Sequence, residues 1–189
     1  MTLRTVAALY VDMRRGPYPS MTSVDCWDVS RDAKLYEGPH PVVAHPPCGP
    51  WSKLSHLCTK QDPECGVRAV EQVLEFGGVL EHPAHSKLWS HMNLPRPGEF
   101  HVPHVFTLEV DQCRWGHQAR KHTWLLCSRV DRSRIGALPL WREPTHVIDS
   151  SKASKRAGTD VGKHIPKSRR HLTPPEFAQF LVRLARSVQ

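Results

Sequence analysis

The sequence predicts a single α/β domain with a mostly parallel sheet and a C-terminal helix. Short apolar runs of strand length recur along the chain, and runs that are apolar throughout are typical of strands buried on both faces of a parallel sheet. An amphipathic pattern of helical spacing follows at the C-terminus. With 189 residues, 39% of them hydrophobic and 23% charged, the chain can bury one hydrophobic core and is too short for a multidomain assembly.

Two buried strands are expected near the N-terminus, at residues 5–11 (TVAALYV) and 41–45 (PVVAH). Branched and aromatic side chains favour strand in these runs. Between them lie a turn region rich in Gly and Pro and a stretch, residues 24–33, with room for a short strand and a loop. This leaves too little chain for a complete βαβ unit.

A helix is expected to begin with Asp62 as its N-cap and Pro63 at the first helical position. A pair of glycines ends it. Its apolar face is predicted to contain Val67, Val70 and Leu74. The next apolar run predicts a buried strand whose last residue, Glu81, emerges at the edge of the sheet.

Two further strands are expected at 105–110 (VFTLEV) and 122–127 (HTWLLC), joined by a polar connection. In the last helix, Thr173 and Glu176 have the spacing of a capping box. Apolar residues then follow at helical spacing, namely Phe177, Leu181, Leu184, Ala185 and Val188. We therefore divide the single domain into an α/β core at 1–142, a basic linker at 143–172 and a helix at 173–189 that packs on the core.

The charge of the chain favours a polyanionic partner. Lysine and arginine number 26 against 18 aspartate and glutamate, which gives a net charge of +8, and thirteen histidines can add to it at lower pH. Basic residues concentrate in one segment, against the single acid Asp160: Lys152, Lys155, Arg156, Lys163, Lys167, Arg169 and Arg170. This segment is either a nucleic-acid contact or a solvated, flexible stretch.

The sequence predicts a cytoplasmic protein with reduced thiols. No run approaches 18 apolar residues, and the apolar run near the first residue is too short for a secretory signal. Six cysteines in a reducing compartment are more often buried, metal-bound or catalytic than paired. A zinc site drawing on Cys48, His56, Cys58 and Cys65 is the alternative, but their spacing matches no tight zinc knuckle, so we predict no metal.

The strongest local signal is the run 45–52 (HPPCGPWS), which follows a predicted strand. Ligands bind at the carboxyl ends of strands in open α/β sheets. Two prolines fix the backbone there and project the next side chain, the thiol of Cys48, out of the sheet. In isolation such a cysteine is more often a buried structural residue.

Three motifs together resemble the DNA cytosine-5 methyltransferase family. The first resembles the family's nucleophile loop, P-P-C-x-x-[FW]-S, through Pro46, Pro47, Cys48, Trp51 and Ser52. Glu81, followed by His82, resembles the family's E-N-V element, and Gln112 and Arg114 resemble the start of its Q-x-R-x-R element. The motifs keep the family's order and cover roughly the middle third of the chain.

The resemblance implies a role for each of these residues. Cys48 would add as a thiolate to C6 of a pyrimidine, which makes C5 nucleophilic enough to accept a one-carbon group. Glu81 would bind the base edge and act as the acid near N3, and Arg114, supported by Gln112, would stabilise the developing negative charge. Trp51 and Ser52 would shape the loop.

The resemblance also implies a reduced Rossmann-like methyltransferase fold, DNA as partner and S-adenosylmethionine as cofactor. A chain too short for a separate target-recognition domain is more similar to small phage- or prophage-encoded methyltransferase-like proteins, active in the host cytoplasm. The family's glycine-rich cofactor loop is not matched after the first strand. Asp12, Trp27 and Asp28 are the candidates for holding an adenosyl group, through hydrogen bonds and stacking.

Other departures keep two alternatives open. Gly49, His82 and Gly116 stand where the family has Gln, Asn and a second Arg. One alternative is a pyrimidine-modifying enzyme that uses the same cysteine with another donor or a free nucleotide. The other is a catalytically inactive DNA-binding protein of the same fold.

Overall fold

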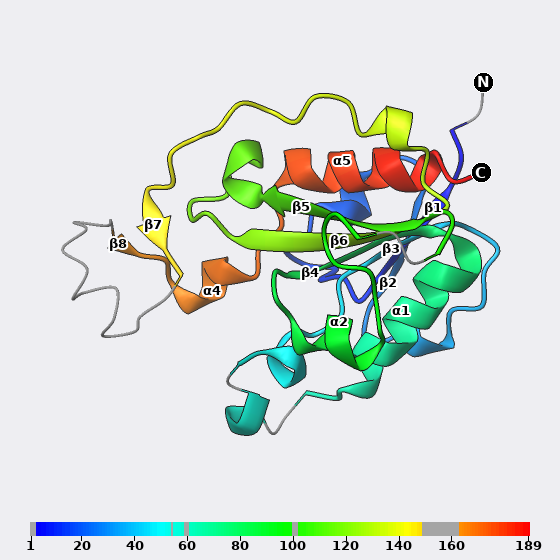
Figure 1. The fold of residues 1–189 in the computed structure, drawn as a ribbon. Coiled ribbons are helices and arrows are strands. Elements are labelled where there is room, and N and C mark those ends of the chain that lie inside the picture. Colours follow the sequence, from blue (N-terminus) through cyan, green and yellow to red (C-terminus); the bar gives the residue numbers. More distant parts are fainter. Residues whose placement is uncertain (1–2, 54, 59–60, 100–101, 149–162) are drawn as a thin grey trace.

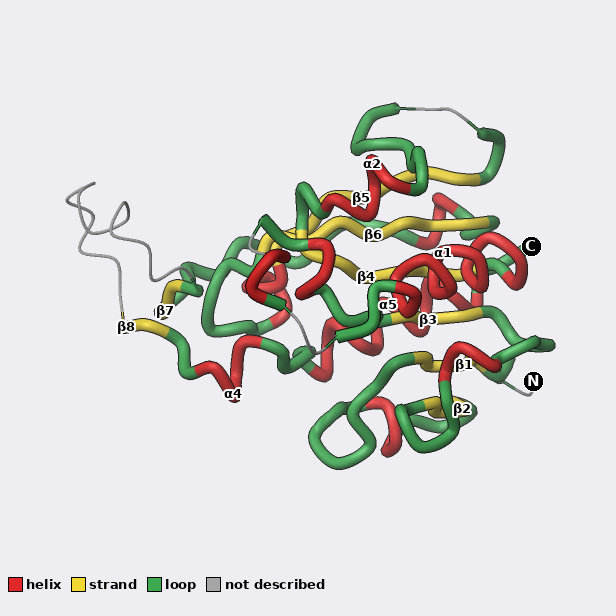
Figure 2. Tube along the Cα trace, turned by 90° about the horizontal axis from the view of Figure 1, so that it is seen from below, coloured by secondary structure: helices red, strands yellow, loops and turns green. Residues whose placement is uncertain are grey.

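The computed structural model describes residues 3–53, 55–58, 61–99, 102–148 and 163–189. It contains a six-stranded mixed sheet with the order β2-β1-β3-β4-β6-β5 (Figures 1 and 2). The strands are β1 (Val6–Leu9), β2 (Val24–Trp27), β3 (Val42–Ala44), β4 (Gly78–Pro83), β5 (Val105–Asp111) and β6 (His122–Ser128). Strands β1 to β4 pair in parallel, whereas β6 is antiparallel to both β4 and β5. The predicted α/β class and mostly parallel sheet are confirmed.

The register brings the carboxyl ends of the parallel strands to one edge of the sheet. Leu9 pairs with Trp27 on one side and with Ala44 on the other, and Ala44 pairs with Leu80. Strand β1 ends earlier than predicted because Tyr10 adopts a φ of 58°, which no strand residue can continue. The loops after β1, β2, β3 and β4 therefore leave from the same edge.

Helices cover both faces of the sheet (Figure 1). Helix α5 (Pro175–Arg186) packs against β1, β3 and β4 on one face. Helix α1 (Glu64–Phe76) packs against β3, β4 and β6, and the short α2 (Lys87–His91) adds Leu88 and Trp89 to the same apolar cluster. No α-helix lies between β1 and β3, as the short connection predicted.

Short 3-10 turns occupy several connections. They are η1 (Tyr18–Ser20), η2 (Ala33–Leu35), η3 (Gly49–Trp51), η4 (Ser55–Leu57), η5 (Gln112–Trp115) and η6 (Arg132–Arg134). Three of them, η1, η3 and η5, come after β1, β3 and β5 and supply residues to the site described below.

The buried face of α1 differs in part from the prediction. Val70 is fully buried as expected, but Leu74 is 39% exposed and Val73 lies in the core instead. Gln72 is also fully buried. Its buried amide is satisfied because it donates to the carbonyls of Ala33 and Tyr36, and these hydrogen bonds hold the loop after β2 against α1. The helix begins at Glu64, one residue later than predicted.

All five apolar residues predicted for the last helix are buried, four of them in α5 and Val188 two residues after its end. Its predicted capping box is wrong, because Pro174 occupies the N-cap position and no side chain caps the first turn. Phe177 and Phe180 of this helix pack against Trp115 with ring centroids 4.9 Å apart in each pair, which joins the helix to the connection between β5 and β6.

The segment predicted as a basic linker contains a small parallel ribbon, β7 (His146–Val147) and β8 (Lys163–His164), followed by α4 (Lys167–Arg170). Lys152, Lys155 and Arg156 lie outside the described residues. Within the described part of the chain, no helix is long and apolar enough to cross a membrane.

Removing the side chain of Leu181 should destabilise the domain strongly. Leu181 lies on the buried face of α5 and is fully buried, so Leu181→Ala should lower the free energy of unfolding by about 2–5 kcal/mol in urea titrations. Leu140→Ala is the matched control, because Leu140 is 88% exposed and its truncation should change the free energy by less than about 0.5 kcal/mol. Equal losses in the two variants would contradict the placement of α5 on the sheet.

Candidate active site

Cys48 lies just beyond the carboxyl end of β3, where the chain turns into η3. Its thiol is partly exposed and none of the six cysteines is paired. The turn closes through a hydrogen bond from the amide of Trp51 to the carbonyl of Cys48, 3.2 Å. Pro46 and Pro47 carry the chain out of the strand, as the sequence predicted for a projected thiol.

Two side chains closely approach Gly49, the residue after the cysteine. The amide of Gly49 donates to Oε1 of Gln61 at 3.1 Å. A Cβ built on Gly49 would lie 2.2 Å from that oxygen and 2.4 Å from Sγ of Cys58. Both atoms are the ends of flexible side chains, so a larger residue at this position requires Gln61 and Cys58 to move.

Trp51 and Ser52 hold the shape of the cysteine loop. Trp51 is 8% exposed and packs on α1 at Gly66, where a Cβ would come within 2.3 Å of the indole nitrogen. Its ring centroid is 4.9 Å from that of His91 in α2. The hydroxyl of Ser52 donates to the carbonyl of Gly49 at 2.9 Å, which closes the turn.

Glu81 is the centre of a buried polar network. It lies within β4, which runs two residues beyond the predicted end, and it is only 8% exposed. Nε2 of Gln112 donates to its Oε1 at 2.8 Å, and Nδ1 of His45 lies 3.0 Å from its Oε2. The hydroxyl of Tyr18 is in turn 2.6 Å from Nε2 of His45. The network thus joins η1, the end of β3, β4 and η5.

The cation at this network is Lys121. Its Nζ lies 4.0 Å from Oε1 of Glu81, and its side chain is 15% exposed. Sequence reasoning missed it because it belongs to no recognised motif; its position just before β6, the strand that pairs with β4, was the available signal.

Arg114 interacts elsewhere. Its guanidinium donates to the carbonyl of Pro139 at 2.8 Å and lies 5.5 Å from the ring centroid of Trp141. No ion pair joins it to Glu81 among the described residues, so the structure brings Gln112 to the acid but not Arg114.

The network keeps Glu81 as a carboxylate in the free protein. Burial by itself raises the pKa of this carboxyl, but the charge of Lys121 and the hydrogen bond from His45 outweigh burial and lower the pKa well below its ordinary value. The predicted role as an acid therefore requires a proton that the free carboxyl does not hold. In the free protein, the ionised carboxylate of Glu81 acts as a hydrogen-bond acceptor.

The Cys48 thiol is held in its protonated form. Burial raises its pKa first, the negative charge of Glu81 raises it further, and Lys121 opposes both. A nucleophilic thiolate would therefore form more readily when a ligand neutralises or screens Glu81. Among the described titratable groups, these two opposite charges have the largest electrostatic effects on the pKa of the thiol.

His82 lies on the opposite face of β4 from Glu81 and replaces the family's asparagine. It is 1% exposed, and neither ring nitrogen has a well-aligned hydrogen bond. Burial lowers its pKa to about 4, although Glu81 and the nearby carbonyl of Pro47 favour the charged ring. The ring therefore packs as a neutral group beneath the prolines of the cysteine loop.

The predicted adenosyl-binding residues are engaged in local structure. Oδ1 of Asp12 accepts from the amides of Arg14 and Arg15, and Oδ1 of Asp28 accepts from the hydroxyl of Ser30. Trp27 is enclosed by three contacts. The guanidinium of Arg31 lies 3.9 Å from the centroid of the Trp27 ring, and Tyr36 packs edge-on against the same ring. The indole nitrogen of Trp27 donates to Asp25. An adenine that stacks on this face of Trp27 would have to displace Arg31.

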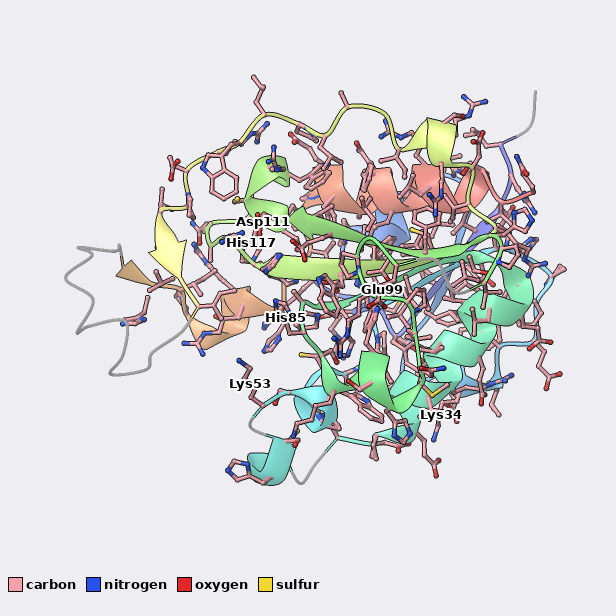
Figure 3. All side chains as sticks on the ribbon, viewed as in Figure 1. Lys34, Lys53, His85, Glu99, Asp111 and His117 are labelled. Atoms are coloured by element: carbon pink, nitrogen blue, oxygen red, sulfur yellow. The ribbon has the colours of Figure 1, made fainter. Side chains whose placement is uncertain are left out.

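The predicted nucleic-acid contacts are only partly described. Arg169 is exposed, and Arg170 donates to the carbonyl of Ile165 at 3.2 Å. The pKa of His171, the residue after α4, is lowered by burial and by the charges of Lys121 and Arg170. Figure 3 shows Lys53, His85 and His117 at the end of the sheet that faces α4 and β8.

The cysteines form no metal cluster. Sγ of Cys58 donates to Gln61 at 3.3 Å, and Sγ of Cys65 is 3.9 Å from a carboxylate oxygen of Asp62. In the described ranges, no group of three or more His, Cys, Asp or Glu residues is placed to hold a metal ion. The alternative of a zinc site therefore gains no support from the geometry.

No family model, curated protein or solved structure matches this chain. Its function has to be inferred from the residues of the site.

The reactivity of Cys48 should respond oppositely to its two charged neighbours. Glu81→Gln removes the charge that raises the thiol pKa, so alkylation of Cys48 by iodoacetamide at neutral pH should accelerate severalfold. Lys121→Met should slow it. The rates are read by mass spectrometry of the Cys48 peptide, with the Cys65 peptide as internal control and circular dichroism as the check of folding. A change in the same direction in both variants would contradict the electrostatic account.

The buried His82 should make the domain less stable in mild acid. Below about pH 6.5 the unfolded chain binds a proton at His82 that the folded chain does not bind until about pH 4. The free energy of unfolding should therefore fall between these pH values, and the fall should be smaller in His82→Asn by on the order of 3 kcal/mol. Replacement of the exposed His56 by Asn is the control that should keep the full dependence. An unchanged fall in His82→Asn would contradict the buried neutral ring.

Proposed function

We propose that the protein is a DNA cytosine-5 methyltransferase-like enzyme, in which Cys48 attacks C6 of a pyrimidine to activate C5. One observation carries the proposal: a partly exposed thiol and a buried carboxylate stand at the carboxyl ends of two adjacent parallel strands, β3 and β4. A cation, Lys121, lies beside the carboxylate. The motif resemblance of the Cys48 loop and the Glu81 strand supports the same chemistry.

The reaction begins with addition of sulfur to the ring. Cys48 gives its thiol proton to solvent, its sulfur forms a bond to C6, and the electrons of the C5–C6 double bond move toward C5 and the ring. The ammonium of Lys121 is a donor at the site that can stabilise the negative charge that develops on the ring. Gln112 acts through Glu81, because its Nε2 already donates to Glu81 and to Thr123. C5 would then attack the electrophilic carbon of a one-carbon donor, and the bond between that carbon and the donor would break with its electron pair staying on the donor. Loss of the C5 proton to solvent restores the C5–C6 double bond as the S–C6 bond breaks, and the released Cys48 thiolate takes a proton from solvent.

Glu81 supplies the recognition of the base edge. An ionised carboxylate accepts hydrogen bonds, and the N4 amine of cytosine is a donor. When N3 is protonated, N4–H and N3–H together match the two oxygens of a carboxylate, so Glu81 would bind the activated ring more tightly than the resting base. This is the form of transition-state complementarity that raises the rate of the chemical step.

DNA is the polyanion that we propose as substrate. A base inside a duplex is out of reach of Cys48, so the target nucleotide would be extruded toward the edge of the sheet. The net charge of +8 and the exposed Arg169 near this edge favour contact with phosphates. S-adenosylmethionine is the donor that the resemblance implies, and the engaged state of Asp12, Trp27 and Asp28 is the observation that favours the two alternatives, another donor or a DNA-binding protein without catalysis.

The test is covalent trapping on DNA that contains 5-fluorocytosine, whose C5 fluorine cannot leave as a proton. Incubation with and without S-adenosylmethionine, followed by denaturing electrophoresis and mass analysis, should give an adduct at Cys48 that depends on the cofactor. Cys48→Ser should abolish it, and Cys58→Ser should leave it intact.

Each other outcome selects an alternative. An adduct that forms without S-adenosylmethionine indicates another donor. Absence of any adduct, with DNA binding that weakens steeply as salt rises, indicates a DNA-binding protein without this catalysis.

A further inference from the structure

The buried carboxylate of Glu81 has two oxygens with unequal surroundings. Oε1 faces both the amide of Gln112 at 2.8 Å and the ammonium of Lys121 at 4.0 Å. Oε2 has one partner among the described residues, the imidazole of His45 at 3.0 Å. Each oxygen accepts one hydrogen bond, and a carboxylate oxygen accepts about two, so each retains an acceptor position. Only Oε1 has the Lys121 ammonium beside it, so Oε2 is the oxygen with no cation facing it among the described residues.

Tyr18 fixes the position of the His45 ring. Its Nε2 lies 2.6 Å from the hydroxyl of Tyr18, and the two rings pack with centroids 5.3 Å apart. Tyr18 is 1% exposed, and burial together with the charge of Glu81 raises the pKa of its hydroxyl, which therefore stays protonated. A protonated hydroxyl can donate to Nε2, which leaves Nδ1–H to donate to the carboxylate. Tyr18 thereby fixes both the orientation of the ring and its tautomer.

We propose that His45 is a positioning residue that aims Oε2 of Glu81 at the substrate base, and that Tyr18 holds His45 in place. The inference rests on the proposed function. It adds that Oε2 of Glu81 is the atom that binds the base and that His45 and Tyr18 hold this oxygen in position. The aimed oxygen is an acceptor, so the substrate class is a pyrimidine with an amine at position 4 rather than an oxo group. An oxo-pyrimidine would place O4, also an acceptor, against Oε2.

The alternative is a polar network that only stabilises the core. Loss of such a network would lower the stability of the fold without changing which base is selected or the rate of reaction of bound DNA. The two roles are therefore separated by the preference between bases and by the ratio of the trapping rate to DNA affinity.

The experiment compares trapping rates on DNA with 5-fluorocytosine and with 5-fluorouracil at saturating DNA. Wild-type protein should react faster with 5-fluorocytosine. His45→Leu should lower the cytosine rate roughly 100-fold with unchanged DNA affinity, because a misplaced catalytic group costs about that factor. It should also reduce the preference for cytosine about tenfold. His45→Gln, which keeps a donor toward Oε2, should recover most of both losses.

Tyr18→Phe should lower the cytosine rate about 3- to 10-fold, as expected for the loss of one hydrogen bond. Tyr36→Phe is the matched control, because Tyr36 is also 1% exposed and its hydroxyl donates to the carbonyl of His40 at 2.8 Å, outside the network. Equal effects of the two Tyr→Phe changes, or an unchanged base preference in His45→Leu, would overturn the inference.

A separate measurement keeps this inference apart from the proposed function. If wild-type protein forms no adduct on either DNA, the proposed function fails, and the positioning of Glu81 is then decided by the 13C NMR titration of its carboxyl. His82 on the same strand and Lys121 also act on that carboxyl, and both stay in place in these variants. A higher titration midpoint in His45→Leu supports the hold of His45 on Glu81, and an unchanged midpoint overturns it.

Discussion

A buried carboxylate governs the arrangement of this site. Removing Glu81 from water without partners would be very costly, so the surrounding chain has to bring donors and a cation to it. Those partners come from three directions: His45 from the end of β3, Gln112 from η5 and Lys121 from the start of β6. The antiparallel insertion of β6 beside β4 is what makes the last of these contacts possible.

The same charge couples the two reactive groups. Glu81 raises the pKa of the Cys48 thiol while Lys121 lowers it, so the state of the carboxylate controls the availability of the nucleophile. A ligand that donates hydrogen bonds to Glu81 would weaken its effect on the thiol. In the reaction that we propose, base recognition and thiol activation would be linked through this one buried residue, so the chemistry would be restricted to bound substrate.

Two short-range features of the site were open to prediction from the sequence. The prolines before Cys48 and the apolar run before them place a thiol at the end of a strand, because proline geometry and strand patterning act locally. Outside the site, the five apolar residues predicted between positions 177 and 188 also lie in the core, as their spacing predicted. Two other local predictions are wrong. No capping box begins α5. In α1, Leu74 faces solvent because the helix is turned so that Val73 packs inward.

The sequence by itself determined the strands of the six-stranded sheet, the position of Cys48 after one of them and the buried face of the last helix, because each of these features depends on residues close together in the chain. The strands β7 and β8 were not predicted. The tertiary structure alone decided that Lys121 rather than Arg114 faces Glu81, that Arg31 covers Trp27, and that His45 and Tyr18 extend the network. These contacts join residues far apart in the chain, and strand order and register determine them. A motif places a residue on its own element, whereas its neighbours in space depend on how the elements pack.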